Sequence, residues 1–281
     1  MRYFDLHCDT AGVCYKKKIL PDDNFLAASL NKGKAFDEWH QCYAMFVPDG
    51  CENPQNEYLS QISDFKSKIK NADNVNAIFT LENATPIVNL DFVDVLSHDG
   101  IKAVTLTWNG GNDLAGGAYT DIGLKNYGRQ VIKALNNKNI AVDLSHLSRK
   151  SFIEAEKQAK SVFASHSCCD KTHHHKRNLT DEQINIIASR GGVIGICFYP
   201  DFLGTKYALE GVWRHIYHLL NMGLEDNIAI GSDFDGADMS AELDGVDKIP
   251  NLHSYLSKRG LSANILDKIF YKNAYDFFTN L

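Results

Sequence analysis

The sequence predicts an α/β protein that folds as a single (β/α)8, TIM-like barrel, and three observations support this prediction. The chain has 281 residues, a suitable length for such a barrel, which takes about 250 residues. Short apolar runs alternate with longer amphipathic segments, as expected for parallel strands joined by crossover helices. Several apolar runs also end in His, Asp or Glu, and active sites form at the carboxyl ends of barrel strands.

Eight apolar runs are predicted to be strands. The first contains Tyr3, Phe4 and Leu6, and it leads into His7 and Asp9. The other seven cover residues 42–47, 75–81, 101–106, 140–144, 161–165, 193–198 and 228–230. Because side chains on a strand alternate between its two faces, we expect His7 and Asp9 to project to the same side.

Helix signals lie between these runs. Ser148 is a predicted N-cap, and Thr180 with Gln183 forms a predicted capping box at the start of another helix. Residues 10–39 show no clear element, and the glycine pairs between residues 110 and 117 predict a loop. The predicted helices other than the one after Thr180 cover residues 53–71, 90–96, 124–135, 149–159, 213–220 and 265–278. No repeat or linker divides the chain, so we expect residues 1–281 to form one domain.

Composition and charge argue against several classes of protein. The chain is 44% hydrophobic and 23% charged, as is usual for a globular protein with a large core. Its formal net charge of −6 and the lack of a basic stripe argue against a nucleic-acid partner. No apolar run approaches the roughly 20 residues that span a bilayer, and no signal peptide precedes the first strand, so no membrane partner is expected. Seven cysteines without a framework spacing indicate a reduced, cytoplasmic setting.

Residues that can bind a metal ion gather at the predicted strand ends. Three are imidazoles and two are carboxylates: His7, Asp9, Glu82, His146 and His166. Each alone is more simply explained as a buried, hydrogen-bonded core residue, but their recurrence at several strand ends favours a metal site. One zinc ion needs three or four protein ligands, so five ligands suit two ions that share a bridging carboxylate. Such ligands also suit manganese or cobalt.

With these residues in place, the chain resembles the membrane dipeptidase (renal dipeptidase) family of zinc metallopeptidases, in the form of a bacterial-type cytoplasmic member. The resemblance covers nearly the whole chain and implies a barrel of the metal-dependent hydrolase type. It is carried by six motifs: "DLHCDT" (5–10), "LEN" (81–83), "DLSH" (143–146), "SHS" (165–167), "RNLTDEQI" (177–184) and "GSDFDG" (231–236).

The resemblance also implies how two zinc ions are held. His7 and Asp9 match the ligands of the first ion, and Glu82 matches the carboxylate that bridges both ions and takes part in catalysis. His146 and His166 match the ligands of the second ion. A hydroxide shared by the two zinc ions would then attack the peptide carbonyl of a dipeptide.

Four further residues correspond to the catalytic and substrate-binding positions of the family. Asp233 matches the acidic residue that accepts a proton and passes it to the leaving amine. Arg177 matches the arginine that binds the substrate carboxylate, and Tyr199 matches a tyrosine on the substrate side. Trp108 stands where the mammalian dipeptidases carry a histidine that helps to bind the carbonyl oxygen, a job that an indole cannot do in the same way. This departure leaves substrate preference open.

Two alternative functions stay open besides the dipeptidase. The first is a related amidohydrolase that acts on a lactam, a cyclic amide or an N-acyl amino acid, although no strand-end lysine is present for a carbamate bridge. The second is a weakly catalytic barrel used as a binding protein, an idea that Trp108 supports. Residues 173–175 are three consecutive histidines, which we expect to be exposed in a loop; the resemblance matches only His175 to a family histidine, and its role stays open. The sequence also leaves open a homodimer and the acceptance of a D-residue at the carboxyl end of the dipeptide.

Overall fold

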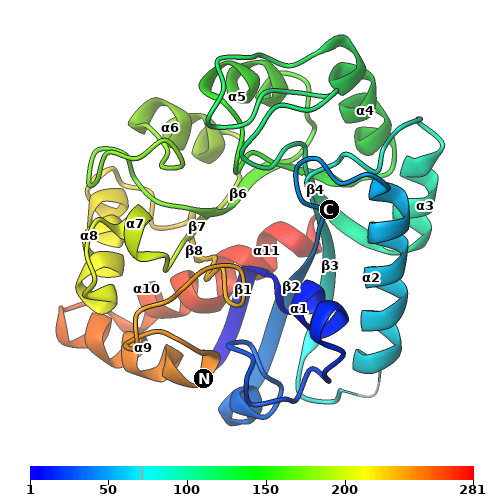
Figure 1. Cartoon of the computed structure of the whole chain (residues 1–281). Coiled ribbons are helices and arrows are strands. Elements are labelled where there is room, and N and C mark those ends of the chain that lie inside the picture. The colour runs from blue at the N-terminus through cyan, green and yellow to red at the C-terminus, as the bar shows by residue number, and fades with distance from the viewer. Residues whose placement is uncertain (71) are drawn as a thin grey trace.

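The computed structural model describes residues 1–70 and 72–281. Within these residues eight parallel strands close into a barrel in chain order, and β8 pairs with β1 to complete it (Figure 1). The strands are β1 (Arg2–Cys8), β2 (Glu38–Phe46), β3 (Asn76–Glu82), β4 (Ile101–Thr105), β5 (Ala141–Asp143), β6 (Val162–Ser167), β7 (Ile194–Ile196) and β8 (Ile228–Ile230). The predicted (β/α)8 class is confirmed, and each predicted strand overlaps a strand of the barrel.

Helices lie in the crossover segments around the barrel, and three more follow the last strand (Figure 1). They are α1 (Thr10–Lys17), α2 (Pro54–Ile69), α3 (Phe92–His98), α4 (Asn126–Asn137), α5 (Arg149–Glu156), α6 (Asp181–Ser189), α7 (Pro200–Leu203), α8 (Ala208–Asn221), α9 (Ile249–Lys258), α10 (Ala263–Asp267) and α11 (Asn273–Thr279). Both predicted caps are confirmed. Ser148 accepts the backbone N–H of Ser151 at the start of α5, and Thr180 and Gln183 form the capping box of α6.

Several helix predictions need correction. The unassigned residues 10–39 contain α1, and α7 and α9 were not predicted. Pro250 lies in the first turn of α9, where its missing N–H costs no hydrogen bond. The helix after Ser148 ends at Glu156 instead of at residue 159, and a π-helical turn, Lys268–Lys272, joins α10 to α11. The last residue of the predicted helix 53–71 lies outside the described residues.

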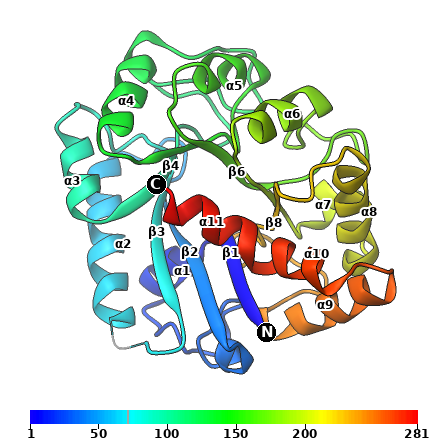
Figure 2. The same cartoon turned by 180° about the vertical axis from the view of Figure 1, so that it is seen from behind.

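The barrel interior is filled at the amino ends of the strands. Phe4, Leu6 and Phe163 pack there against Phe277 and Phe278 from α11. Figure 2 shows α11 lying across this end of the barrel. Ligand access is therefore directed to the carboxyl ends of the strands. No helix in the described part of the chain combines the length and the apolar character needed to cross a bilayer.

The buried His215 lies between α8 and the loop after β6 and makes the stability of the protein depend on pH. It is fully buried, its Nδ1 accepts the N–H of Cys169 at 3.0 Å, and its Nε2 lies 3.4 Å from the carbonyl oxygen of Leu203. Burial lowers the pKa of His215 to about 4. Below pH 6.5 the unfolded chain therefore binds a proton that the folded chain excludes. Stability falls as the pH drops from 6.5 towards 4, by up to about 1.4 kcal/mol per pH unit from this residue.

We predict that His215→Asn flattens this pH dependence, because an amide does not titrate but can still accept the N–H of Cys169. Urea unfolding at pH 7, 6 and 5 would measure the effect against the unsubstituted protein. His98→Asn replaces a 91% exposed imidazole and serves as the control. Parallel stability curves for the His215 variant and the unsubstituted protein would contradict the prediction.

Candidate metal centre

A cavity of about 670 Å³ opens at the carboxyl ends of the strands. Eight of the nine site residues named from the sequence line it: Asp9, Glu82, Trp108, His146, His166, Arg177, Tyr199 and Asp233. The ninth, His7, lies directly beneath and is 2% exposed. The structure thus brings together side chains from β1, β3 and β6 and from the segments that follow β1 and β4 to β8.

Glu82 stands at the middle of this group. Its Oε1 lies 2.9 Å from Nε2 of His146, and its Oε2 lies 3.5 Å from Nε2 of His7. Asp9 completes one triad, because its Oδ2 is 3.3 Å from the same nitrogen of His7. The other triad consists of Glu82, His146 and His166. The two oxygens of Glu82 thus face two separate sets of side chains that could bind a metal ion. A bridging carboxylate has this arrangement.

The hydrogen bonds of His146 and His166 leave their Nε2 atoms without protons. Nδ1 of His146 lies 3.0 Å from the amide oxygen of Asn109, which can only accept, so Nδ1 carries the hydrogen. The hydroxyl of Ser165 donates to Asp143, so it accepts from Nδ1 of His166 at 2.7 Å. The two Nε2 atoms then point lone pairs at each other across 2.8 Å. Such a contact is repulsive unless a cation lies between the nitrogens and Glu82.

The charge states of the buried groups agree with this interpretation. Burial lowers the pKa of His146 to about 4 and that of His166 well below its usual value, which keeps both imidazoles in the neutral form that binds metal. Burial also disfavours charge on His7, but the carboxylates of Glu82 and Asp9 outweigh it and raise the pKa of His7 well above the usual range. The His7 Nε2 atom is buried without a hydrogen-bond partner among the described residues. A cation at this point would replace the proton that the carboxylates attract.

A β-bulge aims His7 into the cavity. In the β1–β2 pair Asp5 faces Gln41 and Cys8 faces Tyr43, so Leu6 and His7 share a single position on the partner strand. The bulge places His7 on the cavity side even though Leu6, its neighbour, also points into the barrel. Simple alternation along the strand is therefore the wrong reason for the contact between His7 and Asp9.

Asp9 reaches His7 because β1 ends at Cys8 and the chain turns directly into α1. Asp9 stands immediately before α1, and its backbone N–H donates to the carbonyl of Phe234 at 2.8 Å. The proximity expected from the sequence is present, but a turn between strand and helix produces it.

A second bulge places His166. In the β6–β7 pair Ala164 faces Ile194 and Ser167 faces Ile196, so Ser165 and His166 share one position opposite Gly195. The carbonyl of Ser165 lies against Gly195 of β7 and against Gly231, the residue that follows β8. A Cβ atom would lie only 1.9 Å from this oxygen at Gly195 and 1.7 Å at Gly231. Glycine at both positions is thus a steric requirement of the bulge that aims His166.

Two further site residues adopt left-handed backbone conformations that are uncommon outside glycine. His146 has φ of 67° and Asp233 has φ of 65°. The carbonyl of His146 accepts the N–H of Ala118 at 2.7 Å, and the N–H of Asp233 donates to the carbonyl of His7 at 3.2 Å. Strained backbone of this kind is held in place by its surroundings and concentrates at functional positions.

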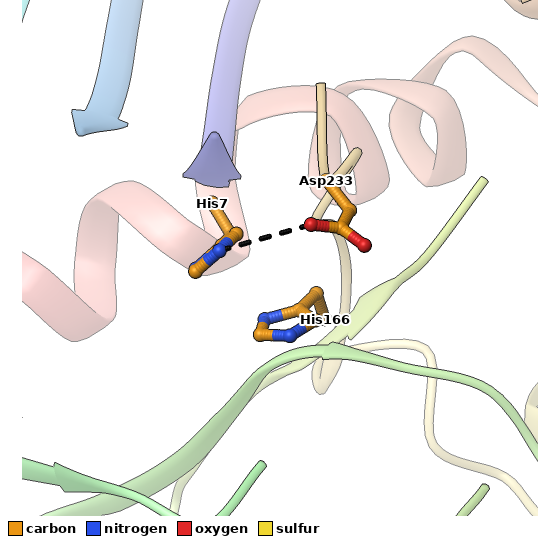
Figure 3. Close-up of side chains that lie close together, drawn as sticks. All are labelled: His7, His166 and Asp233. Atoms are coloured by element: carbon orange, nitrogen blue, oxygen red, sulfur yellow. Dashed lines mark ion pairs between the residues drawn. The ribbon is translucent and has the colours of Figure 1, made fainter. Parts of the chain in front are cut away.

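Asp233 lies close to both triads. Figure 3 shows its carboxylate pointing towards His7 and His166, with Oδ1 3.8 Å from Nε2 of His7. Its Oδ2 accepts a long contact of 3.8 Å from the thiol of Cys197. Burial, together with the nearby carboxylates of Asp9 and Glu82, raises the pKa of Asp233 to about 8, although His7 acts in the opposite direction. The position of Asp233 suits either a proton acceptor or an additional ligand.

Arg177 presents a buried cation to the same cavity. The residue is 4% exposed, and its Nη2 donates to the carbonyl of His166 at 3.3 Å. Its Nε has no partner among the described residues, and its guanidinium lies 5.2 Å from the ring centre of Phe202. His175 accepts the backbone N–H of Arg177 at 3.1 Å and lines the cavity, so the expectation that all three consecutive histidines are exposed is wrong for this one. Only His174, the middle one, is strongly exposed, at 87%.

Tyr199 and Trp108 form parts of the cavity wall. The hydroxyl of Tyr199 donates to Asp201 at 3.0 Å. The indole of Trp108 lies beside His146, with the ring centres 6.4 Å apart. The supporting residues Asn109 and Ser165 were not predicted as site residues. Ser165 stands inside the motif "SHS", so a search for hydrogen-bonding neighbours of each ligand could have found it.

Comparisons with known proteins identify a family for this chain. The family described as membrane dipeptidase (Peptidase family M19) matches residues 41–279. An uncharacterized protein of Klebsiella pneumoniae is 33% identical over 189 residues, which cover 62% of this chain and 70% of that protein. An uncharacterized dipeptidase of Schizosaccharomyces pombe is 32% identical over 199 residues, which cover 67% of this chain. The match spans only 48% of the yeast protein.

A solved structure shares the fold over the whole chain. It is a metallopeptidase from Rhodobacter sphaeroides, described as liganded with a phosphinate mimic of the dipeptide L-Ala-D-Ala. The two proteins superpose with a TM-score of 0.87 at 21% sequence identity, and the match covers 99% of each chain. At this identity the likeness concerns the fold alone.

We predict that Ser165→Ala weakens zinc binding by about 10–100-fold, because it removes the acceptor that fixes the ring of His166. Competition between the metal-free protein and a coloured chelator would measure the affinity directly. Ser167→Ala is the matched control, since this hydroxyl on the same strand is buried without a hydrogen-bond partner among the described residues. Equal zinc affinities in the two variants would contradict the assigned role of Ser165.

Proposed function

The chain belongs to the membrane dipeptidase family, Peptidase family M19, and is therefore a hydrolase; from this membership we propose that it cleaves the peptide bond of dipeptides at a centre of two zinc ions. One observation carries the proposal. Both oxygens of Glu82 face imidazole nitrogens, and the Nε2 atoms of His146 and His166 have free lone pairs. Two triads that share one carboxylate can hold two ions. When bound, the ions activate water and stabilise negative charge on the carbonyl oxygen.

Five side chains of the protein would hold the two ions. His7 and Asp9 would hold one ion and His146 and His166 the other, with Glu82 within reach of both. The ring orientations are set before any ligand arrives, because the two bulges and the partners of Nδ1 in His146 and His166 are part of the fold. Such preorganised groups need no costly rearrangement during the reaction.

Asp233 is proposed to move the proton. Its carboxyl lies beside His7 and His166, close to both triads. A carboxylate in this position can take a proton from water and return it to the leaving amine. The amine then leaves uncharged by proton transfer from Asp233 Oδ1 or Oδ2.

Arg177 is proposed to bind the free carboxylate of the substrate. A buried guanidinium with an unpaired Nε is costly, and a carboxylate offers it charge-assisted hydrogen bonds. Because Arg177 lies in the same cavity as the metal ligands, the distance between the scissile bond and the carboxylate is limited to a very short peptide. The phosphinate dipeptide mimic bound by the Rhodobacter sphaeroides protein is in keeping with this size.

We also propose a reducing, cytoplasmic setting for the protein. All seven cysteines are free thiols, and six of them are buried. An oxidising compartment would expose newly made chains to cross-linking through these thiols.

Zinc titration into the metal-free protein, followed together with dipeptide hydrolysis, tests the proposed function. We expect two ions per chain and full turnover only when both are bound. Asp233→Asn should still bind two ions, whereas its turnover should be slower by about 10²–10⁴-fold with little change in substrate affinity.

The alternatives have distinct outcomes in the same titration. Binding of one ion with no gain in activity under zinc excess would overturn the two-ion centre. If Asp233 is a ligand, the Asn variant loses zinc and activity together and recovers part of both in excess zinc. A fully loaded variant with near-normal turnover would remove Asp233 from the mechanism.

Arg177→Met is expected to weaken the binding of free dipeptides by roughly 1.5–3 kcal/mol, because a charge-assisted contact is lost. Dipeptides with an amidated carboxyl end lack the charge that Arg177 binds. They should therefore be poor substrates for the unsubstituted protein and for the variant. Steady-state kinetics on matched free and amidated pairs would measure the difference. An equal loss on both substrates would show that Arg177 does something else.

A further inference from the structure

The cavity has two opposite walls that differ in character. In a barrel closed in chain order, strands four places apart lie across from each other, so β2 faces β6. The buried cation of Arg177 follows β6, and Phe46 ends β2. The metal-binding residues, with Glu82 at their centre, lie on the floor between these walls.

The wall on the β2 side is apolar and aromatic. The rings of Phe46 and Trp108 meet edge to face, with centres 5.4 Å apart and planes at 62°. Val13, from α1, lines the same cavity. These three side chains, which we term the aromatic wall, are only partly buried, and neither ring belongs to the two hydrophobic cores. Apolar surface that faces a cavity gains free energy when a ligand covers it.

We propose that the aromatic wall binds the side chain of the amino-terminal residue of the dipeptide and selects large apolar or aromatic side chains there. This inference rests on the proposed function. With the substrate carboxylate at Arg177 and the scissile carbonyl above Glu82, the carboxyl-terminal residue lies on the β6 side. The amino-terminal residue then lies on the β2 side, against Phe46 and Trp108.

Charged side chains of both signs also line the cavity. Nζ of Lys16 lies 5.8 Å from the ring centre of Phe46, and Asp201, Asp235 and Asp238 line the same cavity. The aromatic wall itself carries no charge, so an apolar amino-terminal side chain such as that of phenylalanine or leucine covers it best.

A substrate series on the zinc-loaded protein tests the inference. In dipeptides with alanine at the carboxyl end and glycine, leucine, phenylalanine or lysine at the amino end, kcat/KM for phenylalanine should exceed that for glycine by about tenfold or more. Trp108→Ala and Phe46→Ala should each reduce this ratio by about tenfold. Because glycine provides the baseline, a general loss at the metal centre cancels in the ratio.

Binding supplies a second readout. Phosphinate analogues of the glycine and phenylalanine dipeptides, which are not cleaved, should show the same change in their ratio of dissociation constants by calorimetry. Tyr217→Ala, a 51% exposed aromatic residue on α8, is the control and should leave the ratio unchanged. Melting temperature and zinc content would identify a misfolded variant, in which case Phe46→Leu and Trp108→Leu replace the alanine variants.

The possible outcomes separate this inference from the function on which it rests. Hydrolysis of dipeptides with no preference for large amino-terminal side chains would overturn the aromatic wall and leave the dipeptidase standing. A preference that survives both substitutions would do the same. If the substitutions change the preference for the carboxyl-terminal residue instead, the substrate binds in the opposite orientation and the inference is overturned. Complete absence of dipeptide hydrolysis and binding would overturn both proposals.

Discussion

The side chains at the carboxyl ends of the strands are organised around one close contact. This contact is repulsive unless a cation is bound beside it. Two imidazole nitrogens without protons, from His146 and His166, lie 2.8 Å apart beside an oxygen of Glu82. Neither nitrogen can donate a hydrogen bond to the other. The surrounding fold must therefore hold the donors in place before any ion arrives. Much of the local geometry, from tautomer-fixing hydrogen bonds to strained backbone, serves this purpose.

Two buried aspartates stabilise the two bulges in a similar way. Asp5 accepts the N–H and the hydroxyl of Ser232, at 2.9 and 2.6 Å, and so joins β1 to the segment after β8. Asp143 accepts the N–H and the hydroxyl of Ser165, and so joins β5 to β6. Burial raises the pKa of Asp5, whereas the hydrogen bonds from Ser232 act against that rise. The bulges lie in the β1–β2 and β6–β7 pairs, so each carboxylate ties the bulged strand to its neighbour on the opposite side.

The cavity above this floor combines three kinds of recognition. Charged groups at the centre suit a polarised carbonyl, the guanidinium of Arg177 suits a carboxylate, and the rings of Phe46 and Trp108 suit an apolar side chain. These features follow different strands of one barrel and touch one another. Arg177 donates to the carbonyl of His166, and the indole of Trp108 lies beside His146. Trp108 adds apolar area to one wall next to the residues that could bind metal.

The sequence by itself determined the barrel, the order of its strands and the residues that meet at their ends. It could do so because apolar runs and capping residues such as Ser148 are local signals, and because the carboxyl ends of parallel strands converge in any closed barrel. Only the tertiary structure decided how His7 and His166 are aimed, since each bulge depends on distant partners, including the glycines that leave room for the carbonyl of Ser165. The tertiary structure alone also brought Phe46 against Trp108 and His175 into the cavity wall. Those contacts join segments that are far apart in the chain, and no local pattern of residues encodes them.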